Sequence, residues 1–106
     1  MLTDYIIVLV TVKDKAEAEV IAKTLLQEKL IACANIISPV ESCFHWLGKI
    51  EVAGECMIIM KSKASLFKEL DLRVKALHSY EVPEVLALPI VSGSAEYLAW
   101  LDSVLK

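Results

Sequence analysis

The segment Asp4–Val12 (DYIIVLVTV) constrains the fold more than any other stretch, because it is apolar at both odd and even positions. A strand points its side chains alternately to two faces, so a short run of this kind is typical of a strand that is buried on both sides. The segment Cys56–Met60 (CMIIM) has the same character. We therefore expect a sheet with two apolar faces, both of which need cover.

Two further segments have the spacing of amphipathic helices, with apolar residues three or four positions apart. Asp14 precedes the first segment, residues 15–30, and is a suitable N-cap, while Glu17 near its start and Lys29 near its end suit the helix dipole. The apolar stripe of this helix consists of Ala18, Ile21, Leu25 and Leu26. The stripe of the second segment, residues 65–78, consists of Leu66, Phe67, Leu70, Val74 and Leu77.

Between these helices, residues 32–62 predict two long, bent antiparallel strands joined by a hairpin. Pro39 and Gly48 interrupt the β pattern, and Ala53–Gly54 is a turn signal just before the apolar run that follows. Turns of this kind fix how two neighbouring strands pair, so the two strands are expected to lie side by side.

The last part of the chain predicts a strand over residues 84–91 and a short helix over residues 95–105. Pro89 has no backbone N–H to donate, so it belongs at a sheet edge or a bulge. The complete order is strand, helix, strand, strand, helix, strand and C-terminal helix. This order predicts an α+β protein with the ferredoxin-like split βαβ sandwich (β-α-β-β-α-β plus a C-terminal helix), in which helices cover one face of an antiparallel sheet.

The second face of that sheet has no helix left to cover it. The chain of 106 residues has the length of one domain, 1–106, yet 57% of it is hydrophobic and its mean hydropathy is +0.57. Exposed apolar patches of this kind usually mark interfaces. We therefore expect sheet-to-sheet packing between copies of the chain.

Composition argues against several other classes of partner. A net charge of −3 disfavours binding to a phosphate backbone, so no nucleic acid is expected. The longest apolar run, YIIVLVTV, is far shorter than the about 20 residues of a membrane span, and no secretion signal precedes it. Three scattered cysteines predict neither a disulfide framework nor a four-thiolate zinc site, which favours reduced thiols in the cytoplasm.

Candidate chemistry gathers first at the sequence LHSYEVPE, which holds His78, Tyr80, Glu81 and Glu84. His78, Tyr80 and Glu84 have the same parity and would share one face of an extended strand. In such a strand, however, His78 and Glu84 would lie roughly 20 Å apart, too far to share one metal ion unless the chain turns or a second subunit contributes. The alternative is that Tyr80 fills a subunit interface and the glutamates pair with nearby Lys or Arg side chains.

A second candidate pair is Cys43 with His45, two residues apart on a predicted strand and therefore on one face. A thiolate and an imidazole suit copper or zinc, although packing in an alternating strand explains the same pattern.

The sequence shows no sign of an active site. No orienting group or oxyanion hole accompanies a cysteine, and three glycines cannot form a Gly-rich phosphate loop, so we expect no enzyme.

The segments ACANIISPVESCFHWLGKIE and LHSYEVPEVLALPIVSGSAEYLAWL closely resemble the CutA divalent-cation tolerance family, in a match that runs over essentially the whole chain. The resemblance implies a ferredoxin-like subunit in a tight homotrimer, a role in tolerance of copper and other divalent ions, and no enzymatic activity. Among the metal-associated positions of the family, His78 and Glu84 have counterparts here. Val10 and Thr11 stand where some members carry a cysteine.

Together these observations predict a cytoplasmic homotrimer that binds copper or another divalent cation, with metal ligands among His78, Glu84, Cys43 and His45. The alternative is a trimeric scaffold or sensor that binds a small molecule or a protein in the grooves between subunits. The interface or groove residues would then be Trp46, Lys49, Tyr80, Glu81 and Pro83.

Overall fold

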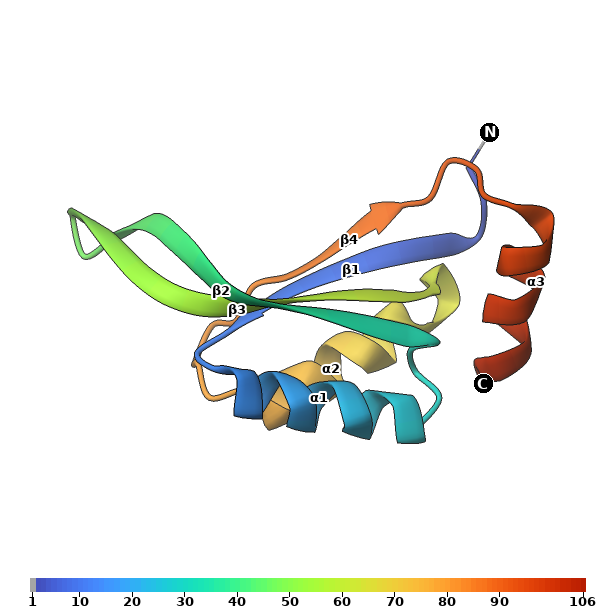
Figure 1. Cartoon of the computed structure of the whole chain (residues 1–106), viewed down its shortest axis with the longest axis horizontal. Helices are drawn as coiled ribbons and strands as arrows, with labels where there is room; N and C mark the ends of the chain where they lie inside the picture. The colour runs from blue at the N-terminus through green and yellow to red at the C-terminus, as the bar shows by residue number, and fades with distance from the viewer. Residues whose placement is uncertain (1) are drawn as a thin grey trace.

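The computed structural model describes residues 2–106, and its strands and helices follow the predicted order (Figure 1). Met1, part of the predicted domain, lies outside the described residues. The elements are β1 (Tyr5–Val12), α1 (Lys15–Gln27), β2 (Cys33–Trp46), β3 (Lys49–Lys63), a 3-10 turn (Ala64–Leu66), α2 (Phe67–Leu77), β4 (Val85–Pro89) and α3 (Ala95–Val104).

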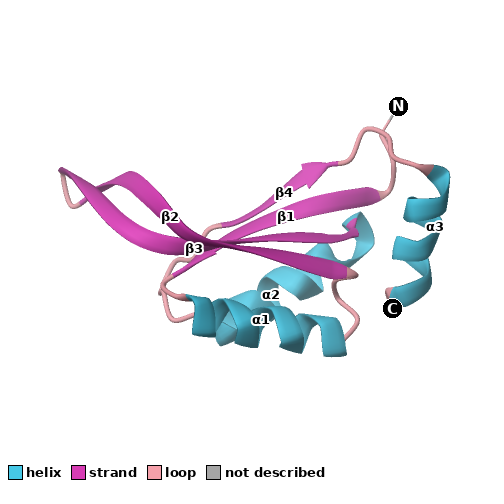
Figure 2. Ribbon diagram, viewed as in Figure 1, coloured by secondary structure: helices cyan, strands magenta, loops and turns pink. Residues whose placement is uncertain are grey.

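The four strands form one antiparallel sheet in the order β2-β3-β1-β4. This order makes β1-α1-β2 and β3-α2-β4 two interlocked split βαβ units, because each pair of parallel strands has a third strand between its members. Helices α1 and α2 lie on one face of the sheet, while α3 stands across one end of it (Figure 2). The predicted α+β, ferredoxin-like fold is therefore confirmed.

The core lies between the sheet and helices α1 and α2. Alternate residues of β1 and β3 point into it, and one side of each helix meets them. The fully buried large side chains include Val8, Val10, Val12, Ile21, Leu25, Ile58, Met60, Leu70 and Val74. Burial of each large apolar side chain contributes about 1.5 to 3 kcal/mol, so this layer supplies the main driving force for folding.

The opposite face of the sheet, here called the open face, is also apolar, as predicted from the first strand. Cross-strand partners share a face, so Leu9 lies there between Ile59 of β3 and Leu86 of β4. The same registers add Ile7, Ile37, Met57 and Leu88. No helix of residues 2–106 lies over this face in Figure 1.

Strands β2 and β3 continue past the end of β1 as a projecting hairpin, here called the arm (residues 41–52; left in Figure 1). The chain reverses at Leu47 and Gly48, whose φ angles are 50° and 76°. The turn predicted at Ala53–Gly54 is wrong, because both residues pair with β2 inside β3. The bend arises instead from a register shift between Ile37 and Val40 in β2.

The helix signals are confirmed except at one end of α1. Asp14 caps α1 by accepting a hydrogen bond of 2.8 Å from the Glu17 amide. Leu26 was expected on the buried stripe but is 40% exposed, because the helix ends at Gln27 and the chain turns away. Lys29 lies beyond the helix with a φ of 59°. Pro89 is the last residue of the edge strand β4, where its missing donor costs no ladder bond.

Candidate functional site

Residues 78–84 connect α2 to β4 without forming a strand, and the chain bends over residues 79–82. The predicted helix over residues 65–78 and strand over residues 84–91 left a connection between them, and the structure has one: helix α2 ends at Leu77, and β4 begins at Val85. His78, Tyr80 and Glu84 therefore do not lie on one extended strand. The rings of His78 and Tyr80 lie close together, with their centres 4.8 Å apart. Glu84 is exposed.

His78 holds this connection against the sheet. Its side chain is 0% exposed, and its Nε2 lies 2.7 Å from the Thr11 carbonyl oxygen of β1. A carbonyl oxygen only accepts, so Nε2 donates, while Nδ1 accepts the Tyr80 amide hydrogen at 3.0 Å. Both ring nitrogens are thus occupied, so a metal ion could bind His78 only by displacing one of these bonds. Metal binding by His78 stays a prediction, and it would require the loss of one of these hydrogen bonds.

Glu17 of α1 fixes the next residue of the same connection. Its carboxylate accepts hydrogen bonds from the Ser79 amide at 2.6 Å and from the Ser79 hydroxyl at 3.0 Å. It also lies 4.0 Å from Nδ1 of His78. The start of α1 and the end of α2 are therefore joined through polar contacts. Sequence reasoning assigned Glu17 only a dipole role, because its partner is 62 positions away.

Tyr80 reaches from this connection to β3. Its hydroxyl donates to Glu55 Oε2 at 2.7 Å, and Glu55 is only 9% exposed. Burial and then the hydrogen bond to the Glu55 carboxylate raise the pKa of Tyr80 to about 12. Both effects disfavour the tyrosinate, so Tyr80 serves as a hydrogen-bond donor to a carboxylate rather than as a base.

The Tyr80 contact should make stability depend on pH in the alkaline range. A raised folded-state pKa means that the contribution is fully present below the ordinary value of 10.0 and is lost as the pH rises toward about 12. We expect Tyr80→Phe to lower the free energy of unfolding by about 1 kcal/mol near neutral pH, since the partly exposed pair is screened by solvent. Urea unfolding of both proteins over a pH series measures this, and a difference that does not shrink above pH 10.0 would contradict the assignment.

The arm carries the second predicted pair. Cys43 faces Val52 and His45 faces Ile50 across the hairpin, so the thiol and the imidazole lie on one face of an exposed ribbon. Within residues 2–106 no group of three or more His, Cys, Asp or Glu side chains is placed to hold a metal ion. The pair therefore offers two ligands, and any third would come from outside the chain.

The predicted groove residues fall in two places. Trp46 and Lys49 face each other beside the turn of the arm. Glu81 and Pro83 line an open depression of about 440 Å³ beside α2, together with Phe67, Asp71, Lys75, Val82 and Val85. Tyr80 lies outside that lining and contacts Glu55 instead. A single copy therefore does not assemble these residues into one groove, and their recognition role stays a prediction.

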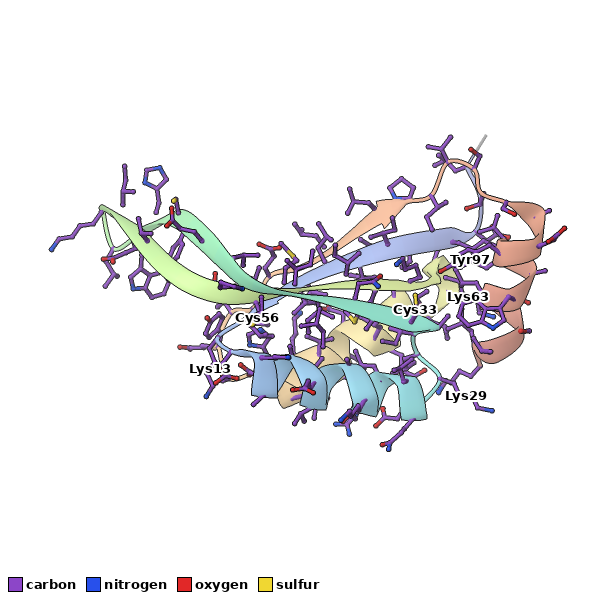
Figure 3. All side chains as sticks on the ribbon, in the orientation of Figure 1. Lys13, Lys29, Cys33, Cys56, Lys63 and Tyr97 are labelled. Atoms are coloured by element: carbon purple, nitrogen blue, oxygen red, sulfur yellow. The ribbon has the colours of Figure 1, made fainter. Side chains whose placement is uncertain are left out.

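Sequence reasoning missed a polar group at the other end of the open face. Cys33 Sγ of β2 lies 3.6 Å from Tyr97 Oη of α3 (Figure 3), and this hydrogen bond, with burial, raises the pKa of Tyr97. Lys61 is the cross-strand partner of Cys33 and donates to the Asn35 amide oxygen. Cys33 and Asn35 are two positions apart on β2 and therefore share a face, but no sequence signal indicates where α3 lies.

Comparison with proteins of known sequence gives consistent results. Residues 6–104 match the model of the family described as CutA1 divalent ion tolerance protein. "Protein CutA, chloroplastic" of Arabidopsis thaliana is 45% identical over 98 residues, which are 92% of this chain and 54% of the relative. "Divalent-cation tolerance protein CutA" of Thermus thermophilus is 44% identical over 95 residues, 90% of this chain and 92% of the relative. The chain thus spans about half the length of the plant relatives but nearly all of the bacterial one.

Solved structures agree over the whole fold. CutA1 from Oryza sativa superposes with a TM-score of 0.95 at 41% identity, covering 99% of this chain and 96% of that one. Cut A1 from Thermus thermophilus gives 0.94 at 41% identity, covering 96% and 99%. Among residues 2–106, no helix combines the length and apolar character needed to cross a membrane. From the sequence match and the shared fold together, the chain belongs to the CutA1 divalent ion tolerance protein family.

Proposed function

We propose that this protein acts in tolerance of divalent cations as a homotrimer that binds copper or a similar divalent ion on its arm. The family match over residues 6–104 and the names of the relatives support the role in tolerance. The observation that carries metal binding is the exposed placement of Cys43 and His45 on one face of the arm.

The open face supports the assembly. Its apolar side chains lie on a sheet face that no described helix covers, and Leu86 and Leu88 are 55% and 45% exposed. An apolar sheet face of this kind favours packing against a second sheet, and the resemblance to the CutA family implies three copies in a closed ring.

The donor sets differ in how well they fit a metal ion. Thiolate and imidazole are ligands that copper and zinc prefer, and both side chains of the Cys43–His45 pair are open to solvent. Exposed Glu84 could add a carboxylate, whereas His78 has both ring nitrogens in use. The arm would hold the ion with further ligands from a neighbouring copy, and the ion would be cargo rather than a catalytic centre. We propose no enzymatic role.

Metal binding by the arm predicts a selective loss. We expect Cys43→Ser and His45→Asn each to weaken copper and zinc binding at least about tenfold in calorimetric titrations of the metal-free protein, since each removes one ligand. Cys33→Ser removes another thiol from the open face and is the matched control, which should bind as the wild type does. Equal binding by all four proteins would contradict the assignment to the arm.

A thermal-shift screen separates this proposal from the alternative. A ligand specific for the folded state raises the melting temperature, so divalent ions should do so and metabolites should not. Stabilisation by a metabolite alone would favour the scaffold or sensor with grooves between subunits. The cytoplasmic location stays a prediction, and fractionation of the source cells would test it.

A further inference from the structure

Most charged side chains that are shielded from solvent form an ion pair with a side chain of opposite charge. Three Lys and Arg residues of the described chain are half-buried: Lys61, Lys63 and Arg73. Arg73 pairs with Glu28 at 2.9 Å, and Lys63 pairs with Asp102 at 3.7 Å. Lys61 has no ion pair among residues 2–106, and its ammonium donates to the neutral Asn35 side chain.

Glu55 is the complementary exception. Among the Asp and Glu residues of residues 2–106, Glu55 is the buried one, at 9% exposure. Its carboxylate accepts a hydrogen bond from the hydroxyl of Tyr80. It forms no ion pair with a Lys, Arg or His side chain of residues 2–106. The hydroxyl satisfies part of the carboxylate but does not neutralise its charge.

These two unmatched charges cannot meet within one copy. Both lie on β3 at positions of the same parity, six residues apart, which is about 20 Å along a strand. Lys61 stands on the open face, opposite Ile7 and Cys33, at the end near α3. Glu55 lies where β1 ends and the arm begins. A pair between them therefore requires a second chain.

We propose that Lys61 of one copy forms an ion pair with Glu55 of the next copy when the open faces pack together. The inference rests on the proposed homotrimer. Covering the open face would remove water from both groups, and an uncompensated charge in an apolar interface is strongly destabilising. In a closed ring each copy presents Lys61 to one neighbour and Glu55 to the other, so every charge of this kind is matched.

A charge swap tests the pair. The proteins are the wild type, Lys61→Glu, Glu55→Lys, the double variant, and Lys68→Glu as a control at an exposed lysine of α2. We expect each single variant at positions 61 and 55 to raise the protein concentration of half-dissociation roughly tenfold or more, and the double variant to recover most of that loss. Light scattering over a dilution series measures oligomer size, and circular dichroism checks folding.

The outcomes separate the two proposals. A wild type that stays monomeric at every concentration overturns the homotrimer and the pair with it. A trimeric wild type whose single variants assemble normally, or whose double variant assembles no better than the singles, overturns the pair alone. Recovery in the double variant supports it, because the two positions are too distant to compensate within one chain.

Cross-linking decides the matter if the variants do not fold. A carbodiimide activates a carboxylate, and attack by a neighbouring amine forms an amide and releases the carbodiimide as a urea. In the wild-type trimer we expect an amide between Lys61 and Glu55, identified by peptide mass spectrometry. The Lys106–Glu69 and Lys75–Asp71 pairs, at 2.6 and 3.0 Å, are internal positive controls. Cross-links at these controls without one at Lys61 would overturn the pair.

Discussion

Ile59→Asp is expected to give a folded chain that no longer assembles. Ile59 is half-buried on the open face, opposite Leu9 and Asn35, and its side chain points away from the core beneath the sheet. In the proposed trimer the aspartate would place a further charge in a buried apolar interface, at a cost of several kcal/mol per subunit. In the separated chain the same aspartate reaches water. Light scattering should therefore report a monomer, with the circular dichroism of the wild type.

The neighbouring residue supplies the matched control. Ile58 is 0% exposed and points into the core between the sheet and the helices, so Ile58→Asp should abolish folding itself. The two substitutions are chemically identical and one position apart, and they differ only in the face that receives the charge. A trimer of native size and stability from Ile59→Asp would contradict the assignment of the open face to assembly.

His78→Ala should be the second large effect, and it should not depend on metal. The substitution leaves the Thr11 carbonyl and the Tyr80 amide without their partner and opens a cavity at a side chain that is 0% exposed. We expect a loss of about 2 to 5 kcal/mol in the free energy of unfolding of the metal-free protein, since two partly buried hydrogen bonds and the packing of a fully buried ring disappear. Urea unfolding with a chelator present measures it.

A conservative variant distinguishes a structural histidine from a metal ligand. His78→Gln retains a side-chain donor that can reach the Thr11 carbonyl, so it should recover part of the lost stability. If His78 were mainly a metal ligand, both variants would match the wild type without metal and differ only when copper or zinc is added. That result would overturn the structural role assigned to His78.

The order of elements was predictable because the apolar period changes clearly along the chain. The continuous run in β1, the three-and-four spacing of α1 and α2, and the capping residue Asp14 each reflect a local rule, and local rules can be read from sequence. The apolar open face was predictable for the same reason. Residues such as Leu9 and Ile59 make β1 and β3 apolar at the alternate positions as well, so both faces of these strands are apolar.

The errors arise where tertiary structure decides. Ala53–Gly54 has turn composition, but pairing with β2 keeps it inside a strand, and the bend lies at the register shift near Pro39. Leu26 has the right spacing for the core, but its helix ends one residue later. Such outcomes depend on partners far away in sequence, which propensity does not report.

The candidate site was predictable only as a set of residue types. Sequence placed Cys43 and His45 on one face, because strand alternation is local. It could not reveal that both ring nitrogens of His78 form hydrogen bonds with backbone groups, or that the Tyr80 hydroxyl donates to Glu55. These contacts depend on how the elements pack together. The unmatched charges of Lys61 and Glu55 likewise appear only when every ion pair of the folded chain is known.

Native mass spectrometry of the purified protein, with and without added copper or zinc, tests the central claim most directly because it reports subunit number and bound metal together. A trimer that takes up a whole number of ions per trimer, and loses them in Cys43→Ser, is the predicted result. A monomer, or a trimer whose metal content varies without a defined ratio, would contradict the proposal that this protein is a homotrimeric binder of divalent cations.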